Sequence, residues 1–343
     1  MGENSGIQWT THTFNPWVGC QRVSPGCTNC YAETYDKRVG GGVDPADGKK
    51  KLRWGPLAPR VSTARENWNK PEKWNRAAAA AGERHRVFCS SLADVFEDRP
   101  ELVPRRAQLF RLIEKTPNLD WLLLTKRPQN IRRMLTETAK LTESAALAAW
   151  HLHDVPMPNV WFGTTVEDQQ RANERVPELL KVPAVVRFLS CEPLLERVVL
   201  PRFCLCGCGK TVETVMAEPS PLNREQREDG MKTGLGIDWI IIGGESGQKA
   251  RPFDLSWARE LVQAARVSGA APFVKQLGAV PVVDESEWRV GNERGLHLLS
   301  GAPHARKSAP AGTVPLKFND AHAGEPAEWP EDLRVREFPE PRR

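Results

Sequence analysis

The sequence predicts an α/β fold built from repeated strand–helix units, as in a complete or partial βα barrel. Short apolar, β-rich runs recur along the chain, and helical segments lie between them. The runs are continuous rather than alternating, which is typical of parallel strands that are buried on both faces. A doubly wound open sheet is the structural alternative, and this pattern does not separate the two.

Seven runs are expected to form strands, and each leads into a polar or helical stretch. They are residues 11–18, 86–91, 119–125, 160–165, 184–190, 237–244 and 272–276. Apolar residues at helical spacing predict helices over 100–115, 131–149, 168–181 and 255–268. Asp254 is expected to cap the last of these helices, and Gly269 follows its C-terminal end.

The chain is expected to hold one large domain over residues 1–300, with an insertion over 203–236. The insertion separates two expected strands and carries cysteines, prolines and charges. Residues 301–343 are rich in proline and charge, which predicts an extended C-terminal appendage.

Composition limits the class of protein. Of the 343 residues, 40% are hydrophobic and 27% are charged, which is typical of a globular chain. The net charge of +5 permits an anionic partner such as nucleic acid without requiring one. No apolar run approaches 20 residues and no secretory signal is present, so we expect a cytoplasmic protein without a membrane partner. The 8 cysteines are then expected to be metal ligands, redox groups or buried thiols rather than disulfides.

Polar side chains follow the expected strands, at the point where each strand ends. The carboxyl ends of parallel strands in a βα barrel meet at one rim, where active sites are built. The sequence therefore predicts a polar pocket at this rim. Its candidate catalytic residues are Lys126, Glu192 and Lys275.

Three cysteines near the start of the chain form the strongest motif. Cys20, Cys27 and Cys30 are spaced C-x6-C-x2-C in a segment that Gly and Pro residues make a loop. Three thiolates suit a zinc site that needs a fourth ligand, for which His12 is a candidate. They also suit a [4Fe–4S] cluster with one open iron. S-adenosylmethionine bound to that iron would be cleaved by electron transfer into its sulfonium.

A second cysteine group lies in the insertion. Cys204, Cys206 and Cys208 alternate with other residues over a short span. A small zinc-binding module is the expected interpretation. An auxiliary iron–sulfur cluster and unliganded thiols are the alternatives.

Several stretches of the chain together resemble a known group of proteins. They are FNPWVGC and SPGCTNCYAE, FCSSLADVFED, LLLTKRP, FGTTVEDQ, FLSCEPLL, WIIIGGESG and FVKQLG, between residues 7 and 278. Together they resemble a phage and bacterial three-cysteine branch of the radical S-adenosylmethionine superfamily. The first cysteine gap has six residues where three are common in that superfamily. The resemblance implies a barrel of that superfamily's type, a [4Fe–4S] cluster, S-adenosylmethionine as cofactor and an electron donor as partner.

The resemblance also implies roles for individual residues. Cys20, Cys27 and Cys30 would ligate the cluster. A Gly-Gly-Glu that binds the methionine amino group in the superfamily follows an early strand, whereas here it follows a late one. The cofactor-binding candidates that the resemblance implies are Ser90, Ser91, Asp94, Glu167, Ser190, Gly243, Gly244 and Glu245.

The expected function is therefore an enzyme that reductively cleaves S-adenosylmethionine to a 5′-deoxyadenosyl radical and modifies a substrate. A base in DNA or RNA is the preferred substrate, as in phage DNA modification. Two alternatives stay open. One is a zinc-dependent nucleic-acid-binding protein without redox chemistry. The other is a metal-dependent barrel hydrolase that uses Asp94, Glu167, Glu192 and Glu245.

Overall fold

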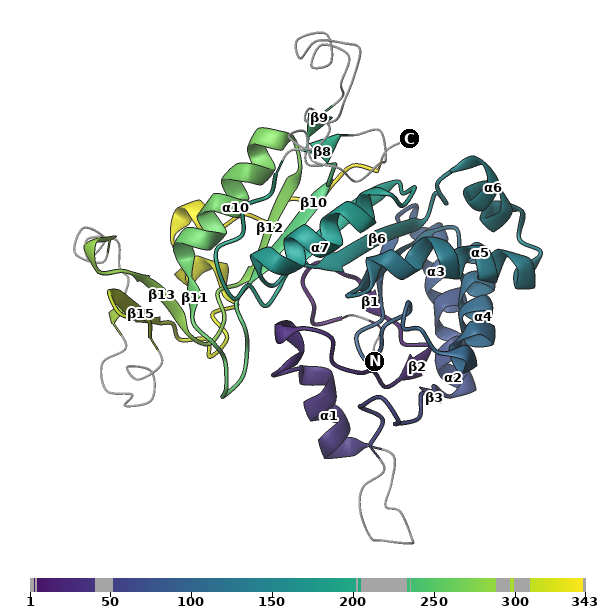
Figure 1. Cartoon of the computed structure of the whole chain (residues 1–343), viewed down its shortest axis with the longest axis horizontal. Helices are drawn as coiled ribbons and strands as arrows, with labels where there is room; N and C mark the ends of the chain where they lie inside the picture. Colours follow the sequence, from purple (N-terminus) through teal and green to yellow (C-terminus); the bar gives the residue numbers. More distant parts are fainter. Residues whose placement is uncertain are drawn as a thin grey trace, which may run out of the picture. The chain divides into compact units, whose positions relative to one another are not determined.

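The structure is a computed structural model, which describes residues 3, 5–40, 52–201, 203–204, 233–234, 236–287, 297–298 and 309–341 (Figure 1). The fold is mixed α/β, as predicted, and its main sheet is parallel and seven-stranded. The strands, in their order across the sheet, are β1 (His12–Thr13), β4 (His85–Cys89), β5 (Leu119–Thr125), β6 (Val160–Thr165), β7 (Val186–Cys191), β10 (Trp239–Gly243) and β12 (Ala271–Gln276). This order has two edges, β1 and β12, and corresponds to a curled half-barrel, the partial form of the predicted barrel.

Helices lie between the strands along the chain. They are α1 (Tyr31–Val39), α2 (Arg65–Trp68), α3 (Lys70–Ala81), α4 (Val103–Glu114), α5 (Ile131–Thr142), α6 (Ala145–His153), α7 (Gln169–Leu180) and α10 (Leu255–Ser268). Short 3₁₀ turns are η1 (Pro25–Cys27), η2 (Pro100–Leu102), η3 (Pro128–Asn130), η5 (Pro326–Glu328) and η6 (Glu331–Leu333). None of these described helices has the length and apolar character that crossing a bilayer requires.

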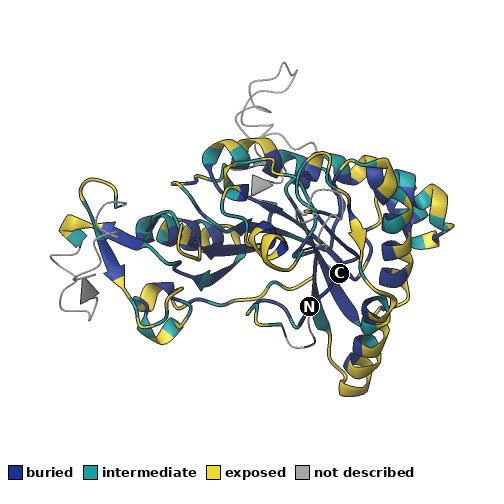
Figure 2. Ribbon diagram, turned by 90° about the horizontal axis from the view of Figure 1, so that it is seen from below, coloured by how far each residue is buried: buried dark blue, intermediate teal, exposed yellow. Residues whose placement is uncertain are grey.

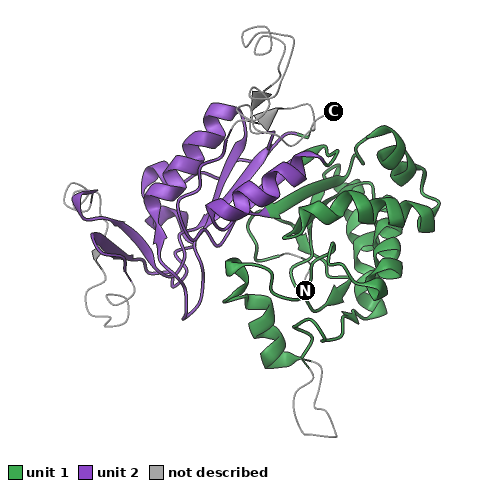
Figure 3. Cartoon of the chain, viewed as in Figure 1, with its two compact units in different colours: residues 1–164, 182–186, 341–343 green, residues 165–181, 187–340 purple. Residues whose placement is uncertain are grey.

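The chain divides into two compact units (Figure 3). Unit 1 comprises residues 1–164, 182–186 and 341–343, and unit 2 comprises residues 165–181 and 187–340. The expected boundary of the large domain at residue 300 stays a prediction.

The core of unit 1 forms around β4, β5 and β6, whose residues are mostly buried on both faces of the sheet. Figure 2 colours the ribbon by the burial of each residue. Trp121 on β5 is fully buried, packs edge-on against Phe14 at 5.5 Å between ring centroids, and donates its indole N–H to Thr116. A buried indole needs such a partner, because an unpaired N–H in an apolar core is costly. The continuous apolar runs of the sequence thus correspond to strands covered on both sides.

The expected helix over 131–149 is two helices. Glu143 adopts a left-handed backbone conformation with φ of 52°, which ends α5 after Thr142. Ser144 then caps α6, because its hydroxyl accepts the backbone N–H of Leu147 at 3.2 Å. The continuous apolar spacing concealed this cap.

The expected first strand, 11–18, is also divided. β1 joins the main sheet, whereas β2 (Trp17–Val18) pairs antiparallel with β3 (Val61–Ser62) in a separate two-stranded sheet. Pro16 lies between them and has no backbone N–H to give to a ladder. The break brings the residues that follow Val18 against the loop that precedes β3.

In unit 2, α10 has the predicted bounds and caps. Asp254 accepts the N–H of Ser256 at its N-terminus, and Gly269 ends it with φ of 76°. A second sheet has the order β11 (Phe253–Asp254), β13 (Pro281–Asp284), β15 (Thr313–Lys317) and β14 (His297–Leu298). β8 (Phe203–Cys204) and β9 (Thr233–Gly234) form an antiparallel pair at the two ends of the expected insertion.

The C-terminal segment differs from the extended appendage that its composition suggests. Trp329 and Leu333 are buried, and Val335 accepts the backbone N–H of Val274 on β12 at 2.8 Å. The indole N–H of Trp239 on β10 reaches the carbonyl of Glu337 at 2.9 Å. Apolar residues spaced among the prolines and charges give this segment enough buried surface to pack on unit 2.

Candidate functional site

The cysteine loop, residues 19–31, starts from a constrained glycine in unit 1. Gly19 has φ of 121°, and a Cβ there would lie 2.5 Å from the carbonyl oxygen of Arg53. Its N–H is bonded to the carbonyl of Leu92, beyond β4, at 3.0 Å. Cys20 follows directly and forms a β-bridge with Trp54, while its carbonyl accepts the N–H of Gly55. The loop that precedes β3 therefore holds Cys20 in place.

The other two cysteines are held by short helical turns. Cys27 ends η1, and Cys30 is the residue before α1. Burial raises the pKa of the Cys30 thiol, while hydrogen bonds from the backbone N–H groups of Glu33 and Ala32 act in the opposite direction. Such N–H donors favour a thiolate and are typical of sulfur ligands of metal centres.

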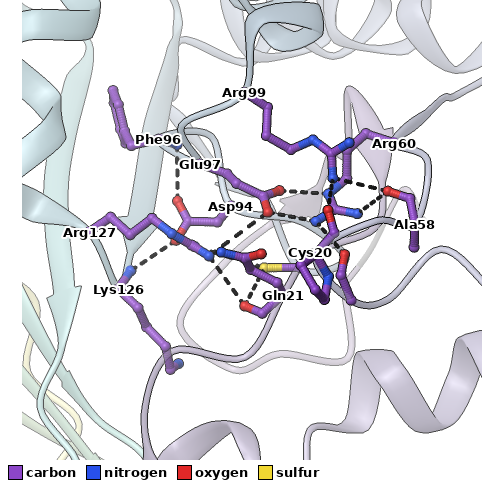
Figure 4. A network of polar contacts seen from close by, with 12 residues as sticks. Cys20, Gln21, Ala58, Arg60, Asp94, Phe96, Glu97, Arg99, Lys126 and Arg127 are labelled. Carbon is purple, nitrogen blue, oxygen red and sulfur yellow. Dashed lines mark hydrogen bonds and ion pairs between the residues drawn. The ribbon is translucent and has the colours of Figure 1, made fainter.

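Arg127 connects Cys20 to the end of β5 (Figure 4). Its guanidinium lies 2.7 Å from a carboxylate oxygen of Asp94 and 3.9 Å from the sulfur of Cys20, and it also donates to the carbonyl of Gln21. Burial raises the pKa of Cys20 to about 12, and Asp94 adds to this effect while Arg127 opposes it. Cys20 is therefore a protonated thiol at neutral pH until a metal or another electrophile displaces the proton.

Asp94 is buried, and both of its carboxylate oxygens accept hydrogen bonds. Its carboxylate accepts from the hydroxyl of Thr125 at 2.7 Å and from the backbone N–H groups of Phe96 and Lys126. Burial alone would raise the pKa of this carboxyl, but Arg127 and these bonds together hold its pKa below the ordinary value. Asp94 is an ionised anchor for Arg127.

A second buried ion pair supports the same loop. Arg60 and Glu97 have side-chain exposures of 0% and 2%, and two bonds of 2.6 and 2.7 Å join them. The remaining N–H groups of Arg60 reach the carbonyls of Arg53, Gly55 and Ala58. All five donors of this guanidinium are thereby satisfied (Figure 4). Arg60 thus fixes the loop against which Cys20 lies.

The predicted serines lie at the end of β4. Ser91 is joined to Asn15 at 3.0 Å through its hydroxyl and to the Tyr31 hydroxyl at 2.7 Å through its carbonyl. The hydroxyl of Ser90 is buried without a hydrogen-bond partner. In unit 1 the structure thus brings Ser91 and Asp94 close to the cysteine loop, and the charge of Lys126 acts on Cys30.

The remaining predicted residues belong to unit 2. Lys275 on β12 lies 2.5 Å from Glu192, and the side-chain amide of Gln276 donates both to Glu192 and to the carbonyl of Gly244. Gly243 and Gly244 make room for this arrangement, because a Cβ on Gly244 would lie 2.5 Å from the carbonyl of Leu277. Two of the three catalytic candidates, Glu192 and Lys275, are therefore direct partners.

The other two carboxylates of unit 2 are paired with arginines. Glu167 lies 2.7 Å from Arg175, and Glu245 lies 2.7 Å from Arg251. Ser190 accepts the backbone N–H of Val166 through its carbonyl. Each of the four carboxylates that a hydrolase would use is thus bonded to a cation, an arrangement that favours structural ion pairs over metal ligands.

His12 is the candidate for a fourth zinc ligand, and of its two ring nitrogens Nε2 is engaged while Nδ1 has no hydrogen-bond partner. It lies in β1, with its ring stacked on Trp74 at 4.3 Å between centroids and one nitrogen 3.1 Å from His85. Burial lowers its pKa to about 4, with a further contribution from His85. In the second cysteine group, Cys206 and Cys208 lie outside the described residues, and only the backbone of Cys204 is described, in β8.

Sequence comparison assigns the chain to a family but gives no activity. A family profile described as "Protein of unknown function (DUF5131)" matches residues 4–307. No curated protein matches the chain.

The expected membership of the radical S-adenosylmethionine superfamily is wrong. The family that matches is one of unknown function, and the cysteines do not form that superfamily's motif. Within the described part of the chain, no three His, Cys, Asp or Glu side chains are placed to hold a metal ion. The physical reason is that Cys20 is tied to the loop before β3, whereas Cys27 and Cys30 lie on turns that lead into α1. The long first gap allows this separation.

Residues that the sequence interpretation missed hold the segments against which the cysteine loop lies. Arg60, Glu97 and Asn15 each make several hydrogen bonds there. Glu97 and Asn15 lie within the stretches FCSSLADVFED and FNPWVGC, which also carry Asp94 and Cys20. This proximity in the sequence was the signal that could have identified them. Nothing near Arg60 in the sequence indicates a buried guanidinium.

Proposed function

Because the chain belongs to the DUF5131 family, whose function is unknown, we propose a function from its own cysteine loop. The proposal is that Cys20, Cys27 and Cys30 bind a metal centre as thiolates, with a [4Fe–4S] cluster as the expected occupant. The donor chemistry fits such a group. The three thiols are free, the backbone N–H groups of Glu33 and Ala32 act to lower the pKa of Cys30, and Arg127 lies beside Cys20.

The observation that carries the choice of cluster over zinc is the position of His12. A structural zinc site needs four protein ligands, and the loop supplies three thiols. The natural fourth ligand, His12, is engaged with His85 and stacked on Trp74. A [4Fe–4S] cluster is held by three thiolates with one iron left open.

The chain's own residues would prepare this centre in three ways. Arg127 balances negative charge near Cys20, while Asp94 keeps that guanidinium in position. The N–H groups of Ala32 and Glu33 stabilise the thiolate of Cys30. A bound cluster would supply an electron-transfer centre with one coordination position for a substrate or cofactor. Because the thiols are not gathered in the described arrangement, binding requires the cysteine loop to adjust.

Anaerobic reconstitution with iron and sulfide tests the proposal. We expect brown protein with about four iron and four sulfide per chain. Single Cys→Ala variants at positions 20, 27 and 30 should lose most of this iron. Cys89→Ala is the matched control, because Cys89 is a free thiol buried in β4 outside the loop, and it should retain the iron.

Two outcomes would contradict this proposal. Colourless protein that takes up one zinc through the same three cysteines would replace the cluster with a zinc site. Protein whose metal content is unchanged by all three loop variants would reject the metal centre altogether. Reductive cleavage of S-adenosylmethionine stays a prediction, which the reconstituted and reduced protein tests by formation of 5′-deoxyadenosine. Enzymatic activity and a cytoplasmic location likewise stay predictions.

A further inference from the structure

The second and third cysteines of the cysteine loop, Cys27 and Cys30, lie at the two ends of one closed turn. The backbone N–H of Cys30 bonds the carbonyl of Cys27 at 3.4 Å. The ends of a four-residue turn closed in this way lie less than about 7 Å apart, measured between their Cα atoms. Disulfides form where the two Cα atoms are about 4.4–6.8 Å apart. The backbone therefore brings these two cysteines into the range that a disulfide spans.

The conformation of this turn also favours contact between the two side chains. Cys27 ends η1, and Thr28 continues in the right-handed helical conformation, with φ of −61° and ψ of −45°. Residues three apart on a helical turn are neighbours on its surface. The spacing of Cys27 and Cys30 is C-x2-C, which is also that of dithiols that cycle between reduced and oxidised forms.

Cys20 is fixed by different contacts. Its backbone is tied to the loop that precedes β3. Its sulfur lies 3.9 Å from the guanidinium of Arg127 and donates to the carbonyl of Gln21 at 3.5 Å (Figure 4). Within the described residues, the three cysteines are not placed together around one point. Cys27 and Cys30 are therefore the two thiols of the loop that the backbone holds as a pair.

Exposure sets the order in which the two thiols react. Cys30 is partly exposed, whereas Cys27 is buried, with 9% of its surface exposed. An accessible thiol next to a second, resolving thiol is typical of redox-sensitive cysteines. Cys89 and Cys191, which are also free thiols, are fully buried in β4 and β7. A dissolved oxidant therefore reaches Cys30 before any of these buried thiols.

We propose that Cys27 and Cys30 form a reversible disulfide when the cysteine loop carries no metal, and that this disulfide withholds both thiols from the metal centre. The oxidant is a small disulfide such as glutathione disulfide. The sulfur of Cys30 attacks one of its two sulfurs, which breaks that S–S bond, releases one glutathione and leaves a mixed disulfide. The sulfur of Cys27 then attacks the sulfur of Cys30 and releases the second glutathione. Two electrons pass to glutathione disulfide, and the two thiol protons end on the two glutathione thiols.

The disulfide itself does not depend on the proposed metal centre, and only its effect on metal uptake rests on that proposal. A cysteine ligates a metal as a thiolate, which a disulfide sulfur cannot supply. Oxidation would thus leave Cys20 as the one free thiol of the cysteine loop. Excess reduced glutathione reverses both exchange steps and returns the two ligands. The turn therefore makes metal loading depend on the thiol–disulfide balance of the surroundings.

Mass spectrometry of chelator-treated protein tests the first part of the inference. The protein is treated with glutathione disulfide, alkylated with iodoacetamide and digested with trypsin. The digest places Cys27 and Cys30 on one peptide, residues 23–37, and Cys20 on another, residues 1–22. We expect peptide 23–37 without alkylation and about 2 Da lighter than its dithiol form, because two hydrogens are lost. Peptide 1–22 should be alkylated. Dithiothreitol before alkylation should restore two alkylation sites on peptide 23–37.

Two variants separate the steps of the exchange. Cys27→Ser should stop after the first step, with one glutathione joined to Cys30. Cys20→Ser is the matched control and should form the disulfide to the same extent as the wild type, because Cys20 takes no part in the exchange. Circular dichroism and thermal melting before oxidation identify any variant that does not fold.

Iron uptake tests the second part. The oxidised protein, reconstituted anaerobically without a thiol reductant, should bind little iron. Treatment with dithiothreitol should restore the iron content of the protein that was never oxidised.

Three results would overturn the inference. One is a peptide 23–37 that carries two alkyl groups after oxidation. Another is a disulfide that joins this peptide to residues 1–22, which would pair Cys20 instead. The third is equal iron uptake by the oxidised and reduced proteins. The first two are measured without metal, so they are distinguishable from failure of the metal centre, which appears as reduced protein that binds no iron.

Discussion

The buried pair of Arg60 and Glu97 offers a quantitative test of how the cysteine loop is held. Glu97→Gln keeps the volume of the side chain but removes the charge that balances a guanidinium with 0% exposure. Removing one partner of such a pair leaves an uncompensated buried charge and costs about 3–5 kcal/mol. With an unfolding entropy of about 2.1 cal/mol/K per residue, taken over all 343 residues, the melting temperature should fall by about 4–7 °C.

Glu101→Gln is the matched control for this change. Glu101 also bonds an arginine, Arg99, at 2.6 Å, but that pair is exposed at the surface. Exposed pairs contribute about 0–1 kcal/mol, so this variant should melt within about 1 °C of the wild type. Differential scanning calorimetry and urea unfolding measure both variants under the same conditions.

A double-mutant cycle with Arg60→Met completes the test. The two residues share two hydrogen bonds, so their substitutions should be non-additive by about 1 kcal/mol or more. The reasoning is refuted if the Glu97→Gln variant has the same melting temperature as the Glu101→Gln variant. Additive effects of the Arg60 and Glu97 substitutions would refute it as well.

Two further predictions concern the same region. Gly19→Ala should destabilise unit 1 by more than about 2 kcal/mol in urea unfolding, because the new Cβ would meet the carbonyl of Arg53. Gly55 has a similar φ, but a Cβ there would meet no other atom, so Gly55→Ala should destabilise the protein less. Asp94→Asn should remove a pH-dependent contribution to the free energy of unfolding. The folded-state pKa of Asp94 lies below its unfolded value, so this contribution is present above about pH 4. It is lost as the pH falls through the lowered pKa. The stability difference between wild type and Asp94→Asn should therefore be largest near neutral pH and should narrow below pH 4. A difference that is constant from pH 7 to pH 3 would contradict this assignment.

The strands were predictable because burial on both faces leaves a strong local pattern. β5 and β6 have the bounds expected from their apolar runs, and α10 has both its expected bounds and its caps. In these elements, local propensity and tertiary burial favour the same structure. The division of 131–149 was missed because a single left-handed residue, Glu143, leaves no trace in the apolar spacing.

The site was less predictable, because its bonds join residues far apart in the chain. The approach of Arg127 to Cys20 and the pairing of Arg60 with Glu97 depend on how loops pack, which no periodicity encodes. The cysteine spacing indicated a metal site but not the positions of the three thiols. The superfamily inferred from the resemblance of the quoted stretches was wrong. The sequence placed Glu192 and Lys275 at the ends of two strands, but it did not predict that they form an ion pair.

The order of the main sheet has a consequence for biosynthesis. Every strand from β4 onward pairs with the sheet strand that precedes it in the chain. A nascent polypeptide can therefore add strands one at a time as it leaves the ribosome, without waiting for a distant partner. Each addition closes only the connection just synthesised, so the entropy cost of closure stays small at every step. The unpaired edge of the growing sheet is then covered by the next strand to emerge, which limits its exposure to other chains.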